Sequence, residues 1–322
     1  MRVLSGIQPS GILHLGNYFG AMREHLRLAD ENEAFYFIAD FHALTTVQDA
    51  ATLRGYRFAA AADYLAIGLD PAHTTLFSQV DVPEVTELAW ILSTLTPMPM
   101  MENAHSYKDK VARGIPASLG LVAYPALMAA DILIYDSDAV PVGGDQKQHV
   151  EITRDIAGKF NRMYGETLKI PVDLIKQDVA IVPGVDGAKM SKSYGNDIPI
   201  FLEGKPLKKR VMSIVTDSTP VEDPKDPDSC NAYAIYRLFA SEEERETMRE
   251  RYRAGGLGYG EVKKEIVARI EEHFADARTR RRALEEHPDE VRDVLAQGAQ
   301  RARAVAQEVM ERVRTACGLG TV

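Results

Sequence analysis

The chain has 322 residues, of which 45% are hydrophobic and 26% charged, and its formal net charge is -9. It can therefore bury a large core in one large or two modest domains, and no apolar run approaches the ~20 residues needed to cross a bilayer. The two cysteines, Cys230 and Cys317, lie far apart and have no CxxC companions, so the sequence does not suggest a disulfide framework or a zinc or iron–sulfur site. Because the chain starts on a strand pattern instead of a signal-like leader, we expect a cytoplasmic protein without membrane contact.

The first predicted element is a buried strand at Val3–Ile7. The turn Gln8-Pro9-Ser10-Gly11 ends it, and a helix starts near Gly16 and Asn17. A strand, a glycine-containing loop and a helix start bring free backbone N–H groups and the positive end of the helix dipole together, which favours phosphate binding. His14 can hydrogen-bond a phosphate oxygen, and Gly16 has no Cβ to keep an adenine ring away. This segment predicts a nucleotide site.

The next elements alternate between helix and strand. We predict a helix at 18–29, a buried strand at 34–39, a helix at 52–67 and a third strand at 74–78. This order predicts right-handed crossovers and an α/β fold with a doubly wound parallel sheet. His42 follows the second strand at the sheet edge where ligands bind, so it either contacts a substrate or pairs with a loop carbonyl.

Residues 79–125 interrupt this alternation, and we interpret them as an insertion packed on the sheet. The insertion holds a helix at 83–95 and the methionine-rich stretch Thr96–Met101. Such methionines fill a core or form a partner surface. The helix predicted at 118–134 is apolar around one carboxylate, Asp131, with no basic neighbour in sequence. A buried carboxylate of this kind indicates a site for a hydrogen-bond donor, although a cap or a loop ion pair is the alternative.

A last short strand is predicted at 140–142. Gly143, Gly144, Asp145 and Gln146 then turn into a helix that ends near residue 164. In this turn the glycines let the backbone approach a ribose, whose hydroxyls Asp145 can bind. Further on, Lys189-Met-Ser-Lys-Ser193 forms a cationic loop with Met190 facing inward, and both ammonium groups can reach the outer phosphates of a triphosphate.

Beyond Asp197 the sequence is helical, with segments expected at 229–240, 242–253, 261–282 and 288–316. We expect this part to form a separate α-helical domain. Its basic positions are Arg278, Arg280, Arg281, Arg282, Arg301, Arg303, Arg312 and Arg314. These arginines either form surface ion pairs, for which Glu308 and Glu311 are available, or contact RNA phosphates and unpaired bases.

Two segments together resemble a known family. His14-Leu15-Gly16-Asn17 resembles the HIGH signature, and Lys189–Ser193 is a complete KMSKS signature, of class I aminoacyl-tRNA synthetases. Three further stretches resemble the tryptophan-specific branch of this family. They are Ser5-Gly-Ile-Gln-Pro-Ser-Gly11, Leu127-Met-Ala-Ala-Asp-Ile-Leu133 and Val140–His149 continuing to Asp155. The likeness extends from the first residues to about Gly318.

The resemblance implies a Rossmann-like catalytic domain at 1–198, with the insertion near a homodimer interface, and an α-helical domain at 199–322 that binds the tRNA anticodon. The implied catalytic residues are His14, Asn17, Lys110, Lys189 and Lys192. The implied ATP contacts are Gln8, Pro9, Ser10, Gly16, Asn17, Gly143, Gly144, Asp145, Ile181, Val182, Lys189, Met190, Ser191, Lys192 and Ser193. Mg²⁺ is expected on the ATP phosphates and not on a protein metal site.

The implied tryptophan contacts are Leu4, His42, Tyr124, Met128, Asp131, Ile132, Val140, Val142 and Gln146. An indole has one N–H donor and no acceptor, so the Asp131 carboxylate complements it. Leu4 stands where relatives often place an aromatic side chain over the indole. The substrates implied are L-tryptophan, ATP and tRNA(Trp). A tyrosine-specific sister enzyme, a non-charging protein that binds tryptophan or RNA, and an enzyme for a modified tryptophan are the alternatives.

Overall fold

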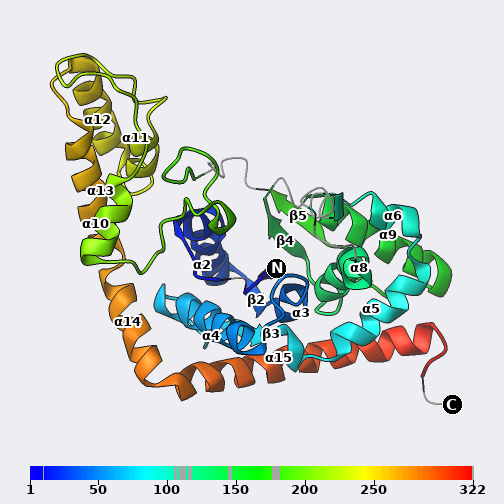
Figure 1. Ribbon diagram of the computed structural model, residues 1–322. Coiled ribbons are helices and arrows are strands. Elements are labelled where there is room, and N and C mark those ends of the chain that lie inside the picture. Colours follow the sequence, from blue (N-terminus) through cyan, green and yellow to red (C-terminus); the bar gives the residue numbers. More distant parts are fainter. Residues whose placement is uncertain are drawn as a thin grey trace.

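The protein is built on a parallel sheet of five strands in the order β3-β2-β1-β4-β5 (Figure 1). The computed structural model describes residues 1–9, 11–104, 107–108, 114, 118–143, 147–175 and 182–320. The strands are β1 Arg2–Ile7, β2 Glu33–Ile38, β3 Thr74–Ser78, β4 Ala139–Val142 and β5 Val172–Ile175. The predicted doubly wound parallel sheet is confirmed. The expectation that 140–142 is the last strand is wrong, because β5 pairs in parallel with β4.

Both faces of the central strands are covered, which explains their continuous apolar runs. Successive side chains of a strand point to opposite faces. On β2, Tyr36 and Ile38 therefore pack in one core while Phe35 and Phe37 pack in the other. A strand buried in this way has no polar side, so its sequence cannot alternate.

The helices of the first half provide the two covering layers. They are α1 Leu15–Asn17, the π-helical turn η1 Tyr18–Met22, α2 Arg23–Glu31, α3 Asp40–Ala43, α4 Ala50–Ala66, the 3₁₀ turn η2 Gln79–Asp81, α5 Glu84–Leu95, α6 Met98–Glu102, α8 Leu119–Leu133 and α9 Lys147–Tyr164. Side chains of α2 and α4 belong to one core, and those of α5, α8 and α9 belong to the other.

The change of covered face occurs between β1 and β4. The connection from β1 to β2 runs through α2 on one face, and the connection from β4 to β5 runs through α9 on the other. In such sheets the crevice beyond the strand ends at this point is where ligands bind. The fold therefore places the candidate site between the C-terminal ends of β1 and β4.

The second half is helical, as expected, but one predicted helix is divided. Its elements are the 3₁₀ turn η4 Lys192–Tyr194, α10 Gly204–Met212, α11 Asn231–Tyr236, α12 Glu242–Ala254, α13 Tyr259–His273, α14 Ala275–Glu286 and α15 Pro288–Ala316. The single helix predicted at 261–282 is interrupted at Phe274. This ring is 1% exposed and packs edge-on against Tyr18, with their centroids 4.9 Å apart. The break between α13 and α14 accompanies this tertiary contact, which the sequence does not encode locally.

The helical half returns to the sheet. Helices α10 to α13 form a lobe beside α2, whereas α14 packs on α4 and α15 lies along β3 and α5 (Figure 1). Side chains of α15 such as Ala302 and Val309 share a core with Leu4 and Phe77. The domain boundary expected at residue 198 therefore stays a prediction, with α15 in contact with the sheet. Within the described ranges, no helix combines the length and the apolar character that a membrane crossing needs.

The contact of α15 with β3 depends on a glycine. A Cβ at Gly298 would lie 1.8 Å from the carbonyl oxygen of Leu76. We predict that Gly298→Ala lowers the free energy of unfolding by about 1 to 3 kcal/mol, because α15 must move away from the strand. Gly55→Ala is the control. Gly55 lies inside α4 with no atom near its missing Cβ, so alanine there should stabilise by up to ~1 kcal/mol. Equal urea midpoints for Gly298→Ala and the unmodified protein would contradict this packing.

Candidate nucleotide and substrate site

The two signature segments touch each other. The Leu15 N–H donates to the Ile198 carbonyl at 2.9 Å, and the Gly16 N–H donates to the Met190 sulfur at 3.3 Å. The Met190 side chain is 4% exposed, so it faces inward as predicted. The expectation that the N–H groups of this helix start are free is wrong for Leu15 and Gly16. Met190 of the lysine loop accepts from Gly16, and Ile198, which follows that loop, accepts from Leu15.

Two glycines allow this close approach. A Cβ at Gly16 would lie 2.9 Å from the His14 ring and 3.3 Å from the Met190 Cβ. Gly11 has φ +136°, a conformation that favours glycine, and a Cβ there would lie 3.1 Å from the Lys192 Nζ. The Lys192 ammonium therefore lies over the backbone of the turn that precedes His14.

The lysine loop is held by a residue that the sequence analysis did not single out. Asn196 is 2% exposed. Its Oδ1 accepts from the Ser191 N–H at 2.7 Å, and its Nδ2 donates to Asp186 Oδ1 at 2.8 Å. Its Nδ2 also donates to the Lys189 carbonyl at 3.2 Å. An asparagine three residues after a signature carries no signal of its own, so only the folded loop reveals this role.

His14 is a neutral group at this junction. It is 7% exposed, and its Nδ1 has no hydrogen-bond partner among the described residues. Burial lowers the pKa of His14 to about 4, and the nearby Lys192 charge acts in the same direction. At pH 7 the imidazole is therefore uncharged. It can bind a phosphate oxygen through a ring N–H but adds no positive charge. Asn17 Oδ1 accepts from the His14 backbone N–H at 3.0 Å and so fixes the start of the helix.

The two signature lysines differ in environment. Lys189 is exposed, whereas Lys192 is half-buried. Burial lowers the pKa of Lys192 to about 8, against the opposing attraction of Asp197 and Asp63. Asp63 in turn pairs with Arg281 of α14 at 2.6 Å. The charge on Lys192 is thus sensitive to its surroundings near physiological pH.

A cavity of about 260 Å³ lies at the crevice between β1 and β4. Every predicted tryptophan contact in the described part of the chain lines it, together with residues that lead into the His14 segment. The predicted ones are Leu4, His42, Tyr124, Met128, Asp131, Ile132, Val140 and Val142, and the others include Ser5, Gly6, Gln8, Phe37 and Gly143. The fold therefore brings side chains from β1, α3, α8 and β4 around one space.

Asp131 is buried in this cavity wall, and it has hydrogen-bond partners from distant parts of the chain although no basic residue is near it in sequence. It is 1% exposed, and its Oδ2 lies 2.8 Å from His42 Nε2 while its Oδ1 accepts from Gln79 Nε2 at 2.7 Å. Burial raises the pKa of Asp131, and these hydrogen bonds oppose that rise. Both partners come from other strand ends, so no local sequence pattern connects them to Asp131. Gln79 was missed for this reason.

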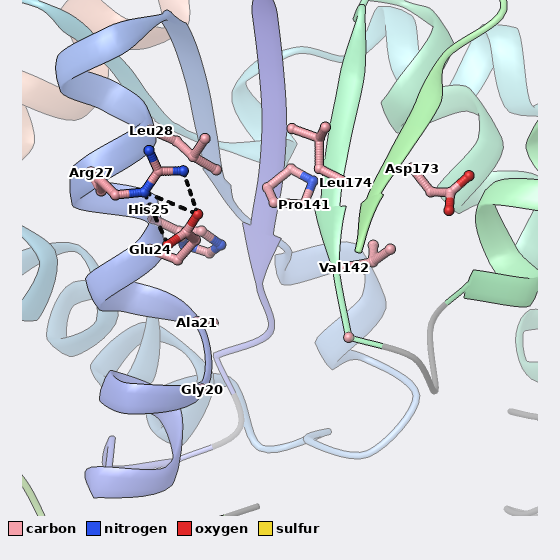
Figure 2. A pocket seen from close by; sticks show the side chains of 11 residues that line it. Gly20, Ala21, Glu24, His25, Arg27, Leu28, Pro141, Val142, Asp173 and Leu174 are labelled. Carbon is pink, nitrogen blue, oxygen red and sulfur yellow. Dashed lines mark hydrogen bonds and ion pairs between the residues drawn. The ribbon is translucent and has the colours of Figure 1, made fainter. Parts of the chain in front are cut away.

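A second cleft of about 390 Å³ adjoins the first on the α2 side of the sheet. Figure 2 shows it between α2 and strands β4 and β5, with Pro141, Val142 and Leu174 on one wall. The two spaces share five lining residues, which are Ala21, His25, Pro141, Val142 and Gly143. Charges at its edge are paired, since Arg27 hydrogen-bonds Glu24. The crevice between β1 and β4, where the covered face of the sheet changes, is therefore open toward α2.

The remaining predicted nucleotide contacts lie in or near this junction. Gln8 Nε2 donates to the His42 carbonyl at 3.0 Å, Pro9 is buried, and the Val182 carbonyl accepts from the Met190 N–H at 2.9 Å. The hydroxyls of Ser191 and Ser193 are 2.8 Å apart. Ser10, Lys110, Gly144, Asp145, Gln146 and Ile181 lie outside the described residues.

The arginines of α14 and α15 bind the protein itself. Arg281 pairs with Asp63, Arg303 with Glu84 at 2.8 Å and Arg312 with Asp136 at 2.7 Å. The others also have protein partners: Arg278 and Arg282 bind Glu203, Arg280 binds the Ala66 carbonyl, Arg301 the Pro71 and Thr74 carbonyls, and Arg314 Glu87. Ion pairs therefore form for six of these arginines, with acidic partners other than the expected Glu308 and Glu311, and contact with RNA stays a prediction.

Comparison with known proteins gives consistent matches. The family model described as tRNA synthetases class I (W and Y) matches residues 1–275. The chain is 56% identical to a tryptophan–tRNA ligase of Rhodopirellula baltica over 319 residues, which cover 99% of this chain and 100% of that protein. It is 54% identical to the corresponding ligase of Fusobacterium nucleatum, with 99% and 98% covered. A crystal structure of tryptophanyl-tRNA synthetase from Campylobacter jejuni complexed with ADP and tryptophan matches with a TM-score of 0.93 and 49% identity, covering 99% of this chain and 100% of that one.

The pKa of Lys192, and its dependence on Asp197, can be measured without any ligand. Asp197 raises the pKa of Lys192, which burial lowers. We predict that Asp197→Asn moves the midpoint of Lys192 deprotonation to below about 8, because the ammonium loses a nearby negative charge. NMR titration of the Lys192 side chain measures this, and Asp293→Asn, on the exposed surface of α15, should leave it unchanged. An unchanged midpoint in Asp197→Asn would show that the two groups do not interact.

Proposed function

Because the chain belongs to the family of class I tRNA synthetases for tryptophan and tyrosine, we propose that it is a tryptophan–tRNA ligase. In this proposal it activates L-tryptophan with ATP to tryptophanyl-adenylate and pyrophosphate, and then transfers the tryptophanyl group to the 3′ end of tRNA(Trp). One observation carries the assignment. An apolar crevice that ends at a buried, acceptor-only carboxylate opens beside the junction of the two signature segments.

The crevice suits an indole. Leu4, Ile132 and Val140 supply apolar walls, and the Asp131 carboxylate can accept the ring N–H. Phenylalanine would leave that carboxylate without this donor, which is a penalty that binding sites use to discriminate. Tyr124, on the same wall, has a hydroxyl that we assign to the α-ammonium group of the amino acid.

The activation step needs alignment and not a protein nucleophile. The tryptophan carboxylate attacks the α-phosphorus, an O–P bond forms, and the bond to the leaving pyrophosphate breaks. We assign His14, as a neutral donor, and the Lys189 and Lys192 ammonium groups to the phosphates that leave. A half-buried ammonium acts in a lower dielectric than water, so Lys192 should stabilise the developing charge more strongly than an exposed lysine would.

We propose that Mg²⁺ arrives on the ATP phosphates. In the described part of the chain, no three histidine, cysteine or carboxylate side chains are grouped to hold a metal ion.

For tRNA we propose the lobe of α10 to α13 as the contact surface. Lys205, Lys208 and Lys209 of α10 are exposed, and lysines of this kind bind phosphate groups. The arginines of α14 and α15 are not part of this surface, because they hold those helices to the sheet and its neighbours. We further propose that the enzyme works in the cytoplasm, where its tRNA substrate is found.

Tryptophan-dependent exchange of labelled pyrophosphate into ATP tests the proposed function directly. We expect exchange with tryptophan and little with tyrosine or phenylalanine. Exchange with tyrosine instead would assign the chain to the other branch of the family. Absence of exchange with either amino acid would favour a protein that binds without charging tRNA.

Lys192 provides a test of the phosphate role. Lys192→Ala should lower kcat for exchange by at least about 100-fold, with the KM for tryptophan nearly unchanged, because charge stabilisation is lost while the crevice is intact. In the unmodified enzyme kcat/KM for ATP should decline above about pH 8, where Lys192 loses its proton, and Lys192→Arg should remove this decline. Lys264→Ala, an exposed lysine of α13, serves as the control. Equal losses in ATP and tryptophan binding would contradict the phosphate role.

We also propose a homodimer formed through the segment after β3. This segment exposes large apolar side chains, with Trp90 72%, Met98 54% and Val80 39% exposed. Exposed apolar side chains that form one contiguous patch mark partner surfaces, and we propose that these three side chains belong to such a patch. We predict that Trp90→Glu converts a dimer to a monomer in light scattering after gel filtration, whereas Trp90→Phe remains dimeric. Dimers of unchanged stability in Trp90→Glu would place the interface elsewhere.

A further inference from the structure

Gln79 connects the end of β3 to the carboxylate at the base of the crevice. Its side chain is fully buried, in the 3₁₀ turn η2. Its Nε2 donates to Asp131 Oδ1 at 2.7 Å, and its Oε1 accepts from the Phe41 backbone N–H at 3.0 Å. Both polar groups of the amide are therefore hydrogen-bonded. The NH₂ group binds Asp131 in the crevice, and the oxygen binds the backbone that follows β2.

The Phe41 N–H fixes the direction of this amide. A backbone N–H can only donate, so it requires the oxygen of Gln79 and leaves the NH₂ group for Asp131. In the reverse orientation, the amide oxygen of Gln79 would face Asp131 Oδ1 at hydrogen-bond distance, and its NH₂ group would face the Phe41 N–H, which is also a donor. Asp131 must therefore present an acceptor to Gln79. An ionised carboxylate satisfies this at both oxygens.

The carboxylate is oriented from two sides. His42 Nε2 lies 2.8 Å from Oδ2, so each oxygen has one protein partner and retains a lone pair for a ligand. Burial and then the charge of Asp131 raise the pKa of two neighbouring phenols, Tyr124 and Tyr135. Burial raises the pKa of Asp131 itself, and the hydrogen bonds from His42 and Gln79, together with the electrostatic interaction with His42, oppose that rise.

We propose that Gln79 is a positioning residue for substrate choice: it keeps Asp131 ionised and fixed in plane, so that the crevice accepts a ring with an N–H donor and rejects a hydrocarbon ring. This inference rests on the proposed function, since it assigns the Asp131 end of the crevice to the indole. Gln79 itself acts through Asp131. Removing its NH₂ should therefore alter tryptophan recognition and leave ATP binding unchanged.

Two substitutions separate this role from packing. Gln79→Met retains approximate volume without the donor. It should raise the KM for tryptophan about ten- to hundredfold in pyrophosphate exchange at saturating ATP, and lower the preference for tryptophan over phenylalanine by a similar factor. Gln79→Glu keeps an oxygen for the Phe41 N–H but faces Asp131 with a second carboxyl group. Two such groups share one proton, so the pKa of one of them rises.

The pH dependence of Gln79→Glu is the decisive readout. Below that raised pKa, the protonated Glu at position 79 donates to Asp131 as the amide does, and tryptophan should bind. Above it the two carboxylates repel each other, so the KM for tryptophan should increase at least about tenfold between pH 6 and pH 9. The KM of Gln79→Met should be high at every pH. Ser78→Ala is the control, because the Ser78 hydroxyl is buried beside this turn without a hydrogen-bond partner in the described structure. Its KM should stay within about twofold.

A tryptophan KM for Gln79→Glu that stays near that of the unmodified enzyme across this pH range would overturn the inference. Equal losses for tryptophan and ATP at every pH would also overturn it, since they indicate a general disturbance of the fold. The activity of the unmodified enzyme separates a failure of the proposed function from a failure of the role of Gln79. If it shows no tryptophan-dependent exchange, the proposed function fails and this inference fails with it. If it exchanges normally while both Gln79 variants match it, only the role of Gln79 is wrong.

Discussion

Contact between a helix start and a distant loop is the constraint on which the site depends. The Gly16 N–H donates to the sulfur of Met190, which is 174 residues away in the chain. Residues 198–200 add to it, because Leu15 donates to the Ile198 carbonyl and Ile200 donates to the Leu13 carbonyl at 3.2 Å. The sheet and its covering helices occupy the chain between these segments. Their packing brings the neutral imidazole of His14 and the ammonium group of Lys192 to the same place, although neither segment forms a site alone.

Burial adjusts the polar groups of this site in opposite directions. It makes His14 uncharged at neutral pH and brings the pKa of Lys192 to about 8. In the crevice, burial raises the pKa of Asp131 while two donors hold it as an acceptor. In the proposed function, the phosphate side therefore combines a neutral donor with a cation, and the amino-acid side presents an oriented carboxyl group. This separation matches a reaction in which one substrate brings phosphates and the other brings a ring N–H.

Local patterns in the sequence predict much of this architecture but few of the hydrogen bonds and ion pairs that connect its elements. The apolar runs at β1, β2 and β3 and the spacing of the helices predict the parallel sheet, and the signature segments identify where the phosphates should bind. Strand β5, four residues long and interrupted by Asp173, carries too weak a pattern to recognise. Asn196 binds residues five to ten positions away in its own loop, but no local motif marks it. Gln79 acts through hydrogen bonds to residues 38 and 52 positions away, and Arg303 and Arg312 of α15 pair with carboxylates far away in the chain. Such long-range pairs leave no trace in a single sequence.

We expect the His14 segment and the lysine loop to bind the same triphosphate. A crystal structure of the enzyme with tryptophan and a non-hydrolysable ATP analogue tests it most directly. We expect phosphate oxygens within hydrogen-bond distance of both His14 and Lys192 Nζ, with the indole N–H donating to Asp131. A triphosphate bound away from both segments, with Lys192 still lying over Gly11, would contradict it.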